Sequence, residues 1–183
     1  DMQLDVNLRA VYLTLRECIP MLKEAGGEHR KALVVNTASI AGKYGQPWLS
    51  AYSATKHAVV GLSAAAHGEL SESGVQVTAL CPGFVETPMT EWVREQVPAD
   101  KMIRPEDIAE AVRFLLKTST NCFVPEVQFV RAGDVPDYWD QRYDPLFAAI
   151  QETNLPICCH IGMNTQLDDL ARRDPTPQKG IFV

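Results

Sequence analysis

Apolar residues recur at intervals of three and four along residues 4–25, and this spacing predicts an amphipathic helix. The apolar positions are Leu8, Val11, Tyr12, Leu15, Ile19 and Leu22. Glycine commonly ends a helix, so we expect the C-terminus of this one at Gly26 and Gly27. Two further helical patterns cover residues 52–73 and residues 104–116.

Short apolar runs rich in β-branched residues lie between these helices and predict buried strands. They cover Ala32–Val35, Val75–Leu80 and Val127–Val130, which are too short for helices. Gly74 is the expected stop between the second helix and the second strand. Residues 39–50 contain two glycines and a proline, so we expect a loop there. Strands that alternate with helices of this size are typical of a parallel sheet, and the expected fold class is α/β.

The pattern changes after Gly133. Residues 134–183 predict a polar, aromatic loop, then a helix from about Pro145 to Thr153, then a buried strand over residues 155–162. We therefore divide the chain into residues 1–133 and residues 134–183.

The composition is that of a globular protein and argues against several kinds of partner. Of the 183 residues, 46% are hydrophobic and 22% are charged, which excludes general disorder. The net charge of −6 argues against a nucleic-acid partner. No stretch reaches the roughly 18 to 20 apolar residues that a membrane span needs, so we expect no membrane partner. Five cysteines without a Cys-x-x-Cys spacing indicate reduced thiols in a cytoplasmic protein.

Tyr52 and Lys56 form the strongest candidate for chemistry. They stand four residues apart at the start of a predicted helix, so both side chains lie on one face. A phenol is a weak acid, and an ammonium one turn away favours its phenolate, which suits the pair to general acid–base catalysis. Ser39 follows a predicted strand, and its hydroxyl could hydrogen-bond an oxygen on which charge develops. Taken alone, a Tyr-x-x-x-Lys pair is more commonly a solvated helix start.

Further motifs accompany this pair in a fixed order. Asn7 precedes Asn36-Thr37-Ala38-Ser39, and Pro82-Gly83-Phe84-Val85-Glu86-Thr87 follows Lys56. In order and spacing, these motifs resemble the short-chain dehydrogenase/reductase family over about residues 1–132. The resemblance implies a Rossmann-like, doubly wound parallel sheet. It also implies hydride transfer between a nicotinamide and the carbon of a small alcohol or carbonyl substrate.

The resemblance implies a role for each matching residue. Tyr52 would exchange a proton with the substrate oxygen, and Lys56 would favour the phenolate and bind the nicotinamide ribose. Ser39 would orient the substrate oxygen, and Asn7 would hold a water in the proton relay. The residues that match the family's nicotinamide contacts are Tyr52, Lys56, Pro82, Gly83, Val85 and Thr87. Two alternatives stay open, namely that Asn7 ties a helix start and that Thr87 is a turn residue.

The cofactor implied by the resemblance is NAD or NADP, and the sequence does not decide between them. The family's domain begins with a strand and a glycine-rich turn that seats the pyrophosphate on a helix N-terminus. Gly26-Gly27 follows a predicted helix rather than a strand, so it does not match that turn. We therefore expect a partial Rossmann-like sheet that lacks its N-terminal half, with cofactor binding and activity impaired.

A stripe of small residues on the second helix permits close helix packing. It consists of Gly61, Ala64, Ala65 and Gly68. In the family this helix and the preceding one pair between subunits, which implies a homodimer or tetramer through residues 4–25 and 52–73. A non-catalytic fragment that pairs through these helices is one alternative function.

Residues 134–183 have a resemblance of their own. Residues 143–147 and 155–162 resemble an internal stretch of the amidohydrolase-2 family, which consists of metal-dependent (β/α)8-barrel hydrolases and decarboxylases. The resemblance implies that His160 is a metal ligand. A catalytic zinc needs three protein ligands, so we favour a core histidine and expect no metal. The expected architecture is thus a partial Rossmann-like domain joined to a barrel fragment, with a metal-dependent hydrolase or decarboxylase as another alternative function.

Overall fold

The protein is described by a computed structural model, which defines residues 1–131 together with Pro145 and Ala148. Several predictions made above lie outside the described residues. They are the barrel fragment, the strand over residues 155–162, most of the helix from Pro145, and His160. The division of the chain at residue 133 also stays a prediction.

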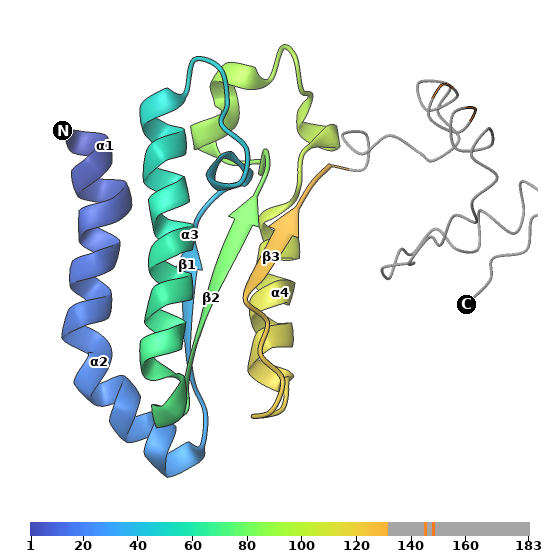
Figure 1. Cartoon of the computed structure of the whole chain (residues 1–183). Coiled ribbons are helices and arrows are strands. Elements are labelled where there is room, and N and C mark those ends of the chain that lie inside the picture. The colour runs from blue at the N-terminus through green and yellow to red at the C-terminus, as the bar shows by residue number, and fades with distance from the viewer. Residues whose placement is uncertain (132–144, 146–147, 149–183) are drawn as a thin grey trace, which may run out of the picture. The chain divides into compact units, whose positions relative to one another are not determined.

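Three parallel strands form the sheet, in the order β1-β2-β3 (Figure 1). They span Ala32–Thr37, Val75–Pro82 and Glu126–Phe129, respectively. The three predicted strands are confirmed, although β1 and β2 each continue two residues beyond their apolar runs. Pairing of backbone groups does not require an apolar side chain, and the ladder between β1 and β2 continues to Thr37 and Leu80.

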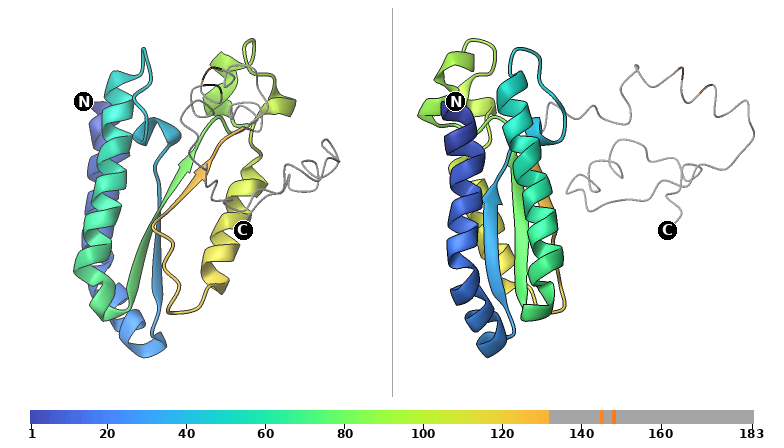
Figure 2. Two further views of the ribbon diagram at one scale, coloured as in Figure 1. Left: turned by 45° about the vertical axis from the view of Figure 1, so that its right-hand side comes forward. Right: turned by 60° about the vertical axis from the view of Figure 1, so that its left-hand side comes forward.

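Helices cover both faces of this sheet. α1 (Met2–Leu4), the π-helical turn η1 (Asp5–Arg9) and α2 (Ala10–His29) follow one another without a break. α3 (Ser50–Leu70) lies beside them, and the 3-10 turn η3 (Ser71–Ser73) follows it. Figure 2 shows α2 and α3 on one face and α4 (Pro105–Lys117) on the other. This arrangement confirms the expected α/β class. Among the helices of the described segments, none combines the length and the apolar character needed to cross a bilayer.

The prediction that the first helix ends at Gly26 is wrong, since α2 continues to His29 and the chain turns at Arg30. Gly26 is needed for a different reason. A Cβ on this residue would lie 2.2 Å from the carbonyl oxygen of Ser73, so only glycine allows α2 to approach η3. Gly74 does act as a stop, with a φ of 75° in the left-handed region.

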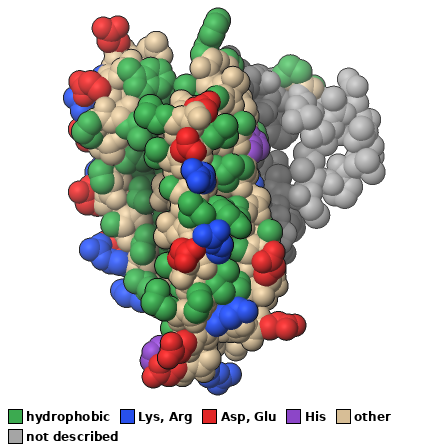
Figure 3. All heavy atoms as spheres, turned by 90° about the vertical axis from the view of Figure 1, so that its left-hand side faces the viewer, with side chains coloured by type: hydrophobic (Ala, Val, Ile, Leu, Met, Phe, Trp, Pro, Cys, Tyr) green, Lys and Arg blue, Asp and Glu red, His purple; other side chains and the backbone are tan. Residues whose placement is uncertain are grey.

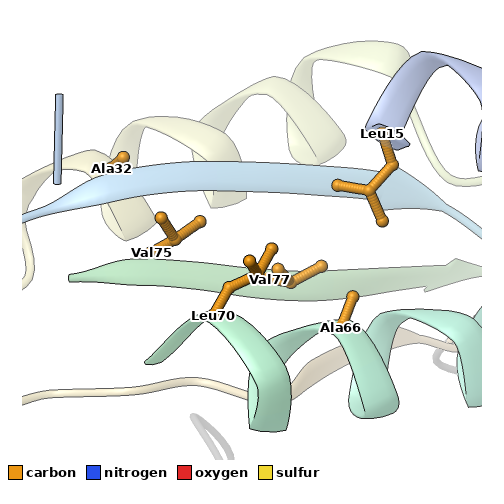
Figure 4. Packing of buried hydrophobic residues seen from close by; sticks show 6 residues of the cluster. All are labelled: Leu15, Ala32, Ala66, Leu70, Val75 and Val77. Carbon is orange, nitrogen blue, oxygen red and sulfur yellow. The ribbon is translucent and has the colours of Figure 1, made fainter. Parts of the chain in front are cut away.

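The main core lies between α2, α3 and the strands (Figure 4). Its buried members are Leu15, Ala32, Ala66, Leu70, Val75 and Val77. A second cluster lies nearer the C-terminal ends of the strands and consists of Ala38, Val59, Ala79 and Cys81. Both clusters hold α3 against the strands, and the second lies beside the strand ends from which the candidate site is built.

Lys31 joins the start of β1 to the end of α4. Its ammonium donates to the carbonyl oxygens of Leu115 and Thr118 at 2.8 and 2.7 Å, and to the hydroxyl of Thr118 at 2.8 Å. The last carbonyls of a helix have no partner within the helix, and a cation suits that end of its dipole. Lys31 therefore caps α4 and holds it against the sheet.

The connection from β2 to α4 contains two short 3-10 turns, η4 (Pro88–Val93) and η5 (Ala99–Lys101). Val93, Val97 and Met102 are buried together there, with Phe84 packed against them. This small cluster fixes the segment that follows β2.

Candidate active site

Ser39 lies just beyond β1 and contacts the end of β2. It is the N-cap of the 3-10 turn η2 (Ile40–Gly42), and its Oγ accepts a hydrogen bond from the Ala41 N–H at 3.1 Å. The same Oγ donates to the carbonyl oxygen of Pro82 at 3.3 Å. The structure therefore brings together two of the predicted motifs, at the edge where the carboxyl ends of parallel strands meet (Figure 1).

Lys56 lies beside the ring of Tyr52 in the first part of α3. Its Nζ is 5.7 Å from the centroid of the phenol ring and donates to the carbonyl oxygen of Thr37 at 3.0 Å. Burial lowers the pKa of Lys56, and the negative charge of an ionised Cys81 would oppose that effect. The sequence predicts a shared face for Tyr52 and Lys56, and this geometry shows it.

Gly42 sets the distance between the Ser39 turn and α3. A Cβ at this position would lie 2.6 Å from the carbonyl oxygen of Lys56 and 2.7 Å from its carbonyl carbon. Glycine therefore allows η2 to pack directly on the backbone of the helix that carries Tyr52. The sequence marks Gly42 only as a loop residue, because the contact joins segments that are distant along the chain.

Asn7 is tied to α3 through Thr55. Its Nδ2 donates to the Thr55 Oγ1 at 3.2 Å, and that hydroxyl donates to the carbonyl oxygen of Tyr52 at 2.7 Å. Asn7 lies in the η1 turn, within the helical run. Its side chain thus contacts α3 near the start of that helix, and both the water-holding role and the helix-start alternative stay predictions.

Thr55 is a part of the site that the sequence reasoning missed. Its side chain is 1% exposed, and the sequence does contain a signal for that burial. Thr55, Val59, Ser63, Ala66 and Leu70 recur at intervals of three and four, and all are buried on one face of α3. A buried hydroxyl needs hydrogen-bond partners, and here the Asn7 side chain and the Tyr52 carbonyl oxygen provide them.

The segment after β2 is held by backbone and hydroxyl contacts. The Gly83 N–H donates to the carbonyl oxygen of Phe129 at 2.9 Å, which ties this segment to β3. Val85 pairs with Ile103 in an isolated parallel bridge. Thr87 is the N-cap of η4, and its Oγ1 donates to the Val85 carbonyl oxygen at 3.4 Å. Thr87 is thus part of a turn, and the nicotinamide contact that the resemblance implies for it stays a prediction.

The donor set at this edge suits a sugar hydroxyl better than a metal ion. An ammonium carries three hydrogens, and among the described residues Lys56 uses one of them, on Thr37. Within residues 1–131 no group of three or more His, Cys, Asp or Glu residues could hold a metal ion. His160, the metal ligand considered above, lies outside the described residues.

Comparison with known proteins identifies relatives for most of the described chain. The family described as short chain dehydrogenase matches residues 1–98. The cyclohexanol dehydrogenase of Acinetobacter sp. is 36% identical over 135 residues, which cover 71% of this chain and 52% of the relative. The chain thus spans about half the length of this curated relative.

Solved structures show the same similarity. A 3-ketoacyl-(acyl-carrier-protein) reductase from Brucella melitensis, crystallised with NADH, aligns with a TM-score of 0.60 and 33% identity. That alignment covers 68% of this chain and 54% of the reductase. A variant of actinorhodin polyketide ketoreductase with NADPH aligns with a TM-score of 0.59 and 32% identity, covering 70% of this chain and 57% of the ketoreductase.

Proposed function

Because the chain belongs to the short-chain dehydrogenase family, we propose that it carries the catalytic side of an NAD(P)-dependent oxidoreductase. The reaction is hydride transfer between a nicotinamide and the carbon of a small alcohol or carbonyl substrate. One observation carries the proposal, namely that Ser39 and Lys56 bind the neighbouring strand ends at Pro82 and Thr37, and that the Lys56 Nζ lies 5.7 Å from the centroid of the Tyr52 ring.

Each of these residues has a task that its surroundings support. In carbonyl reduction, the Tyr52 hydroxyl gives its proton to the substrate oxygen as negative charge develops there, and the reverse transfer serves oxidation. The Lys56 ammonium beside the phenol ring stabilises the phenolate that remains. The Ser39 hydroxyl donates to the same substrate oxygen in place of its bond to Pro82.

In this proposal Asn7 acts through Thr55 and Tyr52 rather than on the substrate directly. Its bond to Thr55, and the bond from Thr55 to the Tyr52 backbone, fix the first turn of α3. In the proposed relay, Asn7 also holds the water through which the proton that Tyr52 gives up is replaced.

A nicotinamide cofactor, when bound, supplies or takes up the hydride. Lys56 and Tyr52 would hold its ribose, and the segment Pro82, Gly83, Val85 and Thr87 would line the nicotinamide. The two solved relatives were crystallised with NADH and with NADPH, respectively. Their similarity supports a nicotinamide and leaves the choice between the two cofactors to experiment.

Thermal unfolding with each cofactor tests the proposal directly. A ligand present at 100 times its dissociation constant stabilises by about 2.7 kcal/mol, which raises the Tm of a domain of this size by roughly 5 to 11 °C. We expect such a shift with NADH or NADPH, and oxidation of that cofactor with a cyclic ketone. Tyr52→Phe removes the proton donor and one ribose contact, so it should keep part of the shift and lose turnover by roughly 10²- to 10⁴-fold.

A Tm that changes with neither NADH nor NADPH would contradict the proposal. The concentration dependence of the shift gives the dissociation constant, and so decides whether binding is as weak as the sequence predicts. Metal-dependent hydrolysis through His160 makes a separate prediction, since Zn²⁺ or Mn²⁺ would then raise the Tm in stoichiometric amounts.

We also propose that the face formed by α1, η1, α2 and α3 binds a second copy of the chain. Figure 3 shows hydrophobic side chains along this face. Leu4 and Tyr12 are each 48% exposed, and with Asp5, Leu8, Arg9 and Leu62 they line a shallow hollow of about 450 Å³. Asp5 and Arg9 already form an ion pair within one copy, with Arg9 Nη1 3.7 Å from Asp5 Oδ1, so a symmetric interface over the hollow would need no new partner for these two charges.

The same face would also serve a non-catalytic fragment, which is the alternative function, because pairing does not require turnover.

A reducing, cytoplasmic location is a further proposal. It is supported by Cys18, Cys81 and Cys122, which are free thiols in the described part of the chain.

A further inference from the structure

The ion pair between Lys43 and Glu126 differs from the others in the described part of the chain. Lys43 Nζ lies 2.7 Å from Glu126 Oε2, and the two side chains are 28% and 27% exposed. Every other ion pair among the described residues joins groups no more than four residues apart, with both partners more than 40% exposed. The Lys43–Glu126 pair alone spans 83 residues, and so joins two separate elements.

Lys43 lies at the end of the turn that Ser39 begins. It is the C-cap of η2, and its N–H donates to the Ile40 carbonyl oxygen at 2.9 Å. Ser39 is the N-cap of the same three-residue turn. A displacement of Lys43 is therefore passed to the Ser39 hydroxyl through a single turn of backbone.

Glu126 lies at the start of β3, whose other end supports the proposed nicotinamide segment. Glu126 Oε1 accepts a bond from the Gln128 side chain at 2.7 Å, which holds the carboxylate in place. Phe129, at the end of β3, accepts the Gly83 N–H. One short strand thus anchors both the Ser39 turn and the segment that begins at Pro82.

Cys81 lies near both this pair and Lys56. The thiol is fully buried in β2, and burial raises its pKa, as does the charge of Glu126, while the charges of Lys43 and Lys56 act in the opposite direction. Partial burial strengthens an ion pair because less water screens it. The hydrogen bond between the partners raises the pKa of Lys43 and lowers that of Glu126, so both stay charged at neutral pH.

We propose that Lys43 and Glu126 are positioning residues, and that their ion pair clamps the Ser39 turn to β3 so that the Ser39 hydroxyl stays aimed at the substrate oxygen. This inference rests on the proposed function for its effect on turnover. The clamp itself makes a separate prediction for the backbone of residues 40–44.

The experiment compares four variants with the wild-type chain. Lys43→Met keeps the stem of the side chain and removes the charge, and Glu126→Gln removes its partner. The double variant Lys43→Met/Glu126→Gln removes both charges, and Lys43→Glu/Glu126→Lys reverses them. Arg16→Met, in the exposed Arg16–Glu17 pair on α2, is the matched control.

Hydrogen exchange tests the clamp without any need for activity. The N–H groups of Ala41, Gly42, Lys43 and Tyr44 all donate to Ser39 or Ile40. Lys43→Met should speed their exchange by roughly five- to tenfold, as expected for the loss of one partly buried ion pair, and leave the α2 amides unchanged. The reversed pair should restore most of the protection. Unchanged exchange in Lys43→Met would overturn the clamp.

Turnover tests the effect on Ser39. Lys43→Met should lower kcat by roughly tenfold or more, because a small displacement of a catalytic group is costly, while KM changes less than about twofold. The double variant should lose no more than either single variant, since the two residues act as one unit. A KM effect without a kcat effect, or additive losses, would overturn the proposal. A wild-type chain without turnover would instead contradict the proposed function, and the exchange rates would still decide the clamp.

Discussion

Lys56 illustrates a conflict between stability and chemistry at a single residue. Burial lowers its pKa, which means that folding disfavours the charged ammonium that the proposed mechanism needs. The backbone carbonyl of Thr37 compensates for part of that loss. A charge retained at a cost to stability is typical of functional sites.

The pH dependence of stability follows from the direction of this shift. The folded pKa lies below the ordinary lysine value of about 10.4, so between the two values the unfolded chain binds more protons and stability rises with pH. The free energy of unfolding of the wild-type chain, relative to Lys56→Met, should therefore rise as pH increases toward 10.4. Urea denaturation across this range measures it, with Lys117→Met on α4 as the control. A constant difference between wild type and Lys56→Met would contradict the expected direction.

At the scale of elements, Gly42 is the residue that allows the turn η2 to pack directly against the backbone of α3. A methyl group there would overlap the Lys56 carbonyl, so Gly42→Ala must move η2 away from α3. We expect a loss of about 1 to 3 kcal/mol in the free energy of unfolding. A displacement approaching 1 Å would lower kcat by roughly 100-fold.

Gly45→Ala provides the matched control for that substitution. Gly45 belongs to the same loop, and a Cβ there would meet nothing within 4 Å. Chemical denaturation and turnover should both leave this variant close to wild type. Equal losses in the two variants would mean that loop flexibility, rather than the contact with Lys56, explains the effect.

The elements themselves were largely predictable, because they follow from local patterns. Apolar runs predicted all three strands, and the spacing of apolar residues predicted the long helices. The end of the first helix was missed because Gly26 serves a contact with Ser73, which no local pattern records. The side-chain contacts of Thr55 and the Lys43–Glu126 pair were missed for the same reason, since each joins groups that only the fold brings together.

At the scale of the whole molecule, association is the property most open to test. If the face formed by α1, η1, α2 and α3 binds a second copy, then Tyr12→Glu should dissociate it, because Tyr12 lines the hollow on this face and a carboxylate there would have to lose its water. Met21→Glu is the control, since Met21 lies on the same helix, is 64% exposed and does not line the hollow.

Sedimentation velocity distinguishes these outcomes. We expect the wild-type chain and Met21→Glu to sediment as dimers or larger assemblies, and Tyr12→Glu to sediment as a monomer. A wild-type chain that stays monomeric at the highest soluble concentration would contradict the proposed interface and leave the proposed chemistry unaffected.

The close approach of the Gly26 and Gly74 backbones limits which substitutions the sequence can accept at these two positions. A Cβ on Gly26 would strike the backbone of Ser73, and a Cβ on Gly74 would lie 2.7 Å from the Gly26 carbonyl oxygen. A side chain cannot be added to either residue without a clash. A substitution at the other residue cannot relieve that clash either, because glycine is already the smallest residue. Drift at this junction therefore requires an insertion or deletion that moves α2 away from η3, so a library randomised at both codons should return glycine at each.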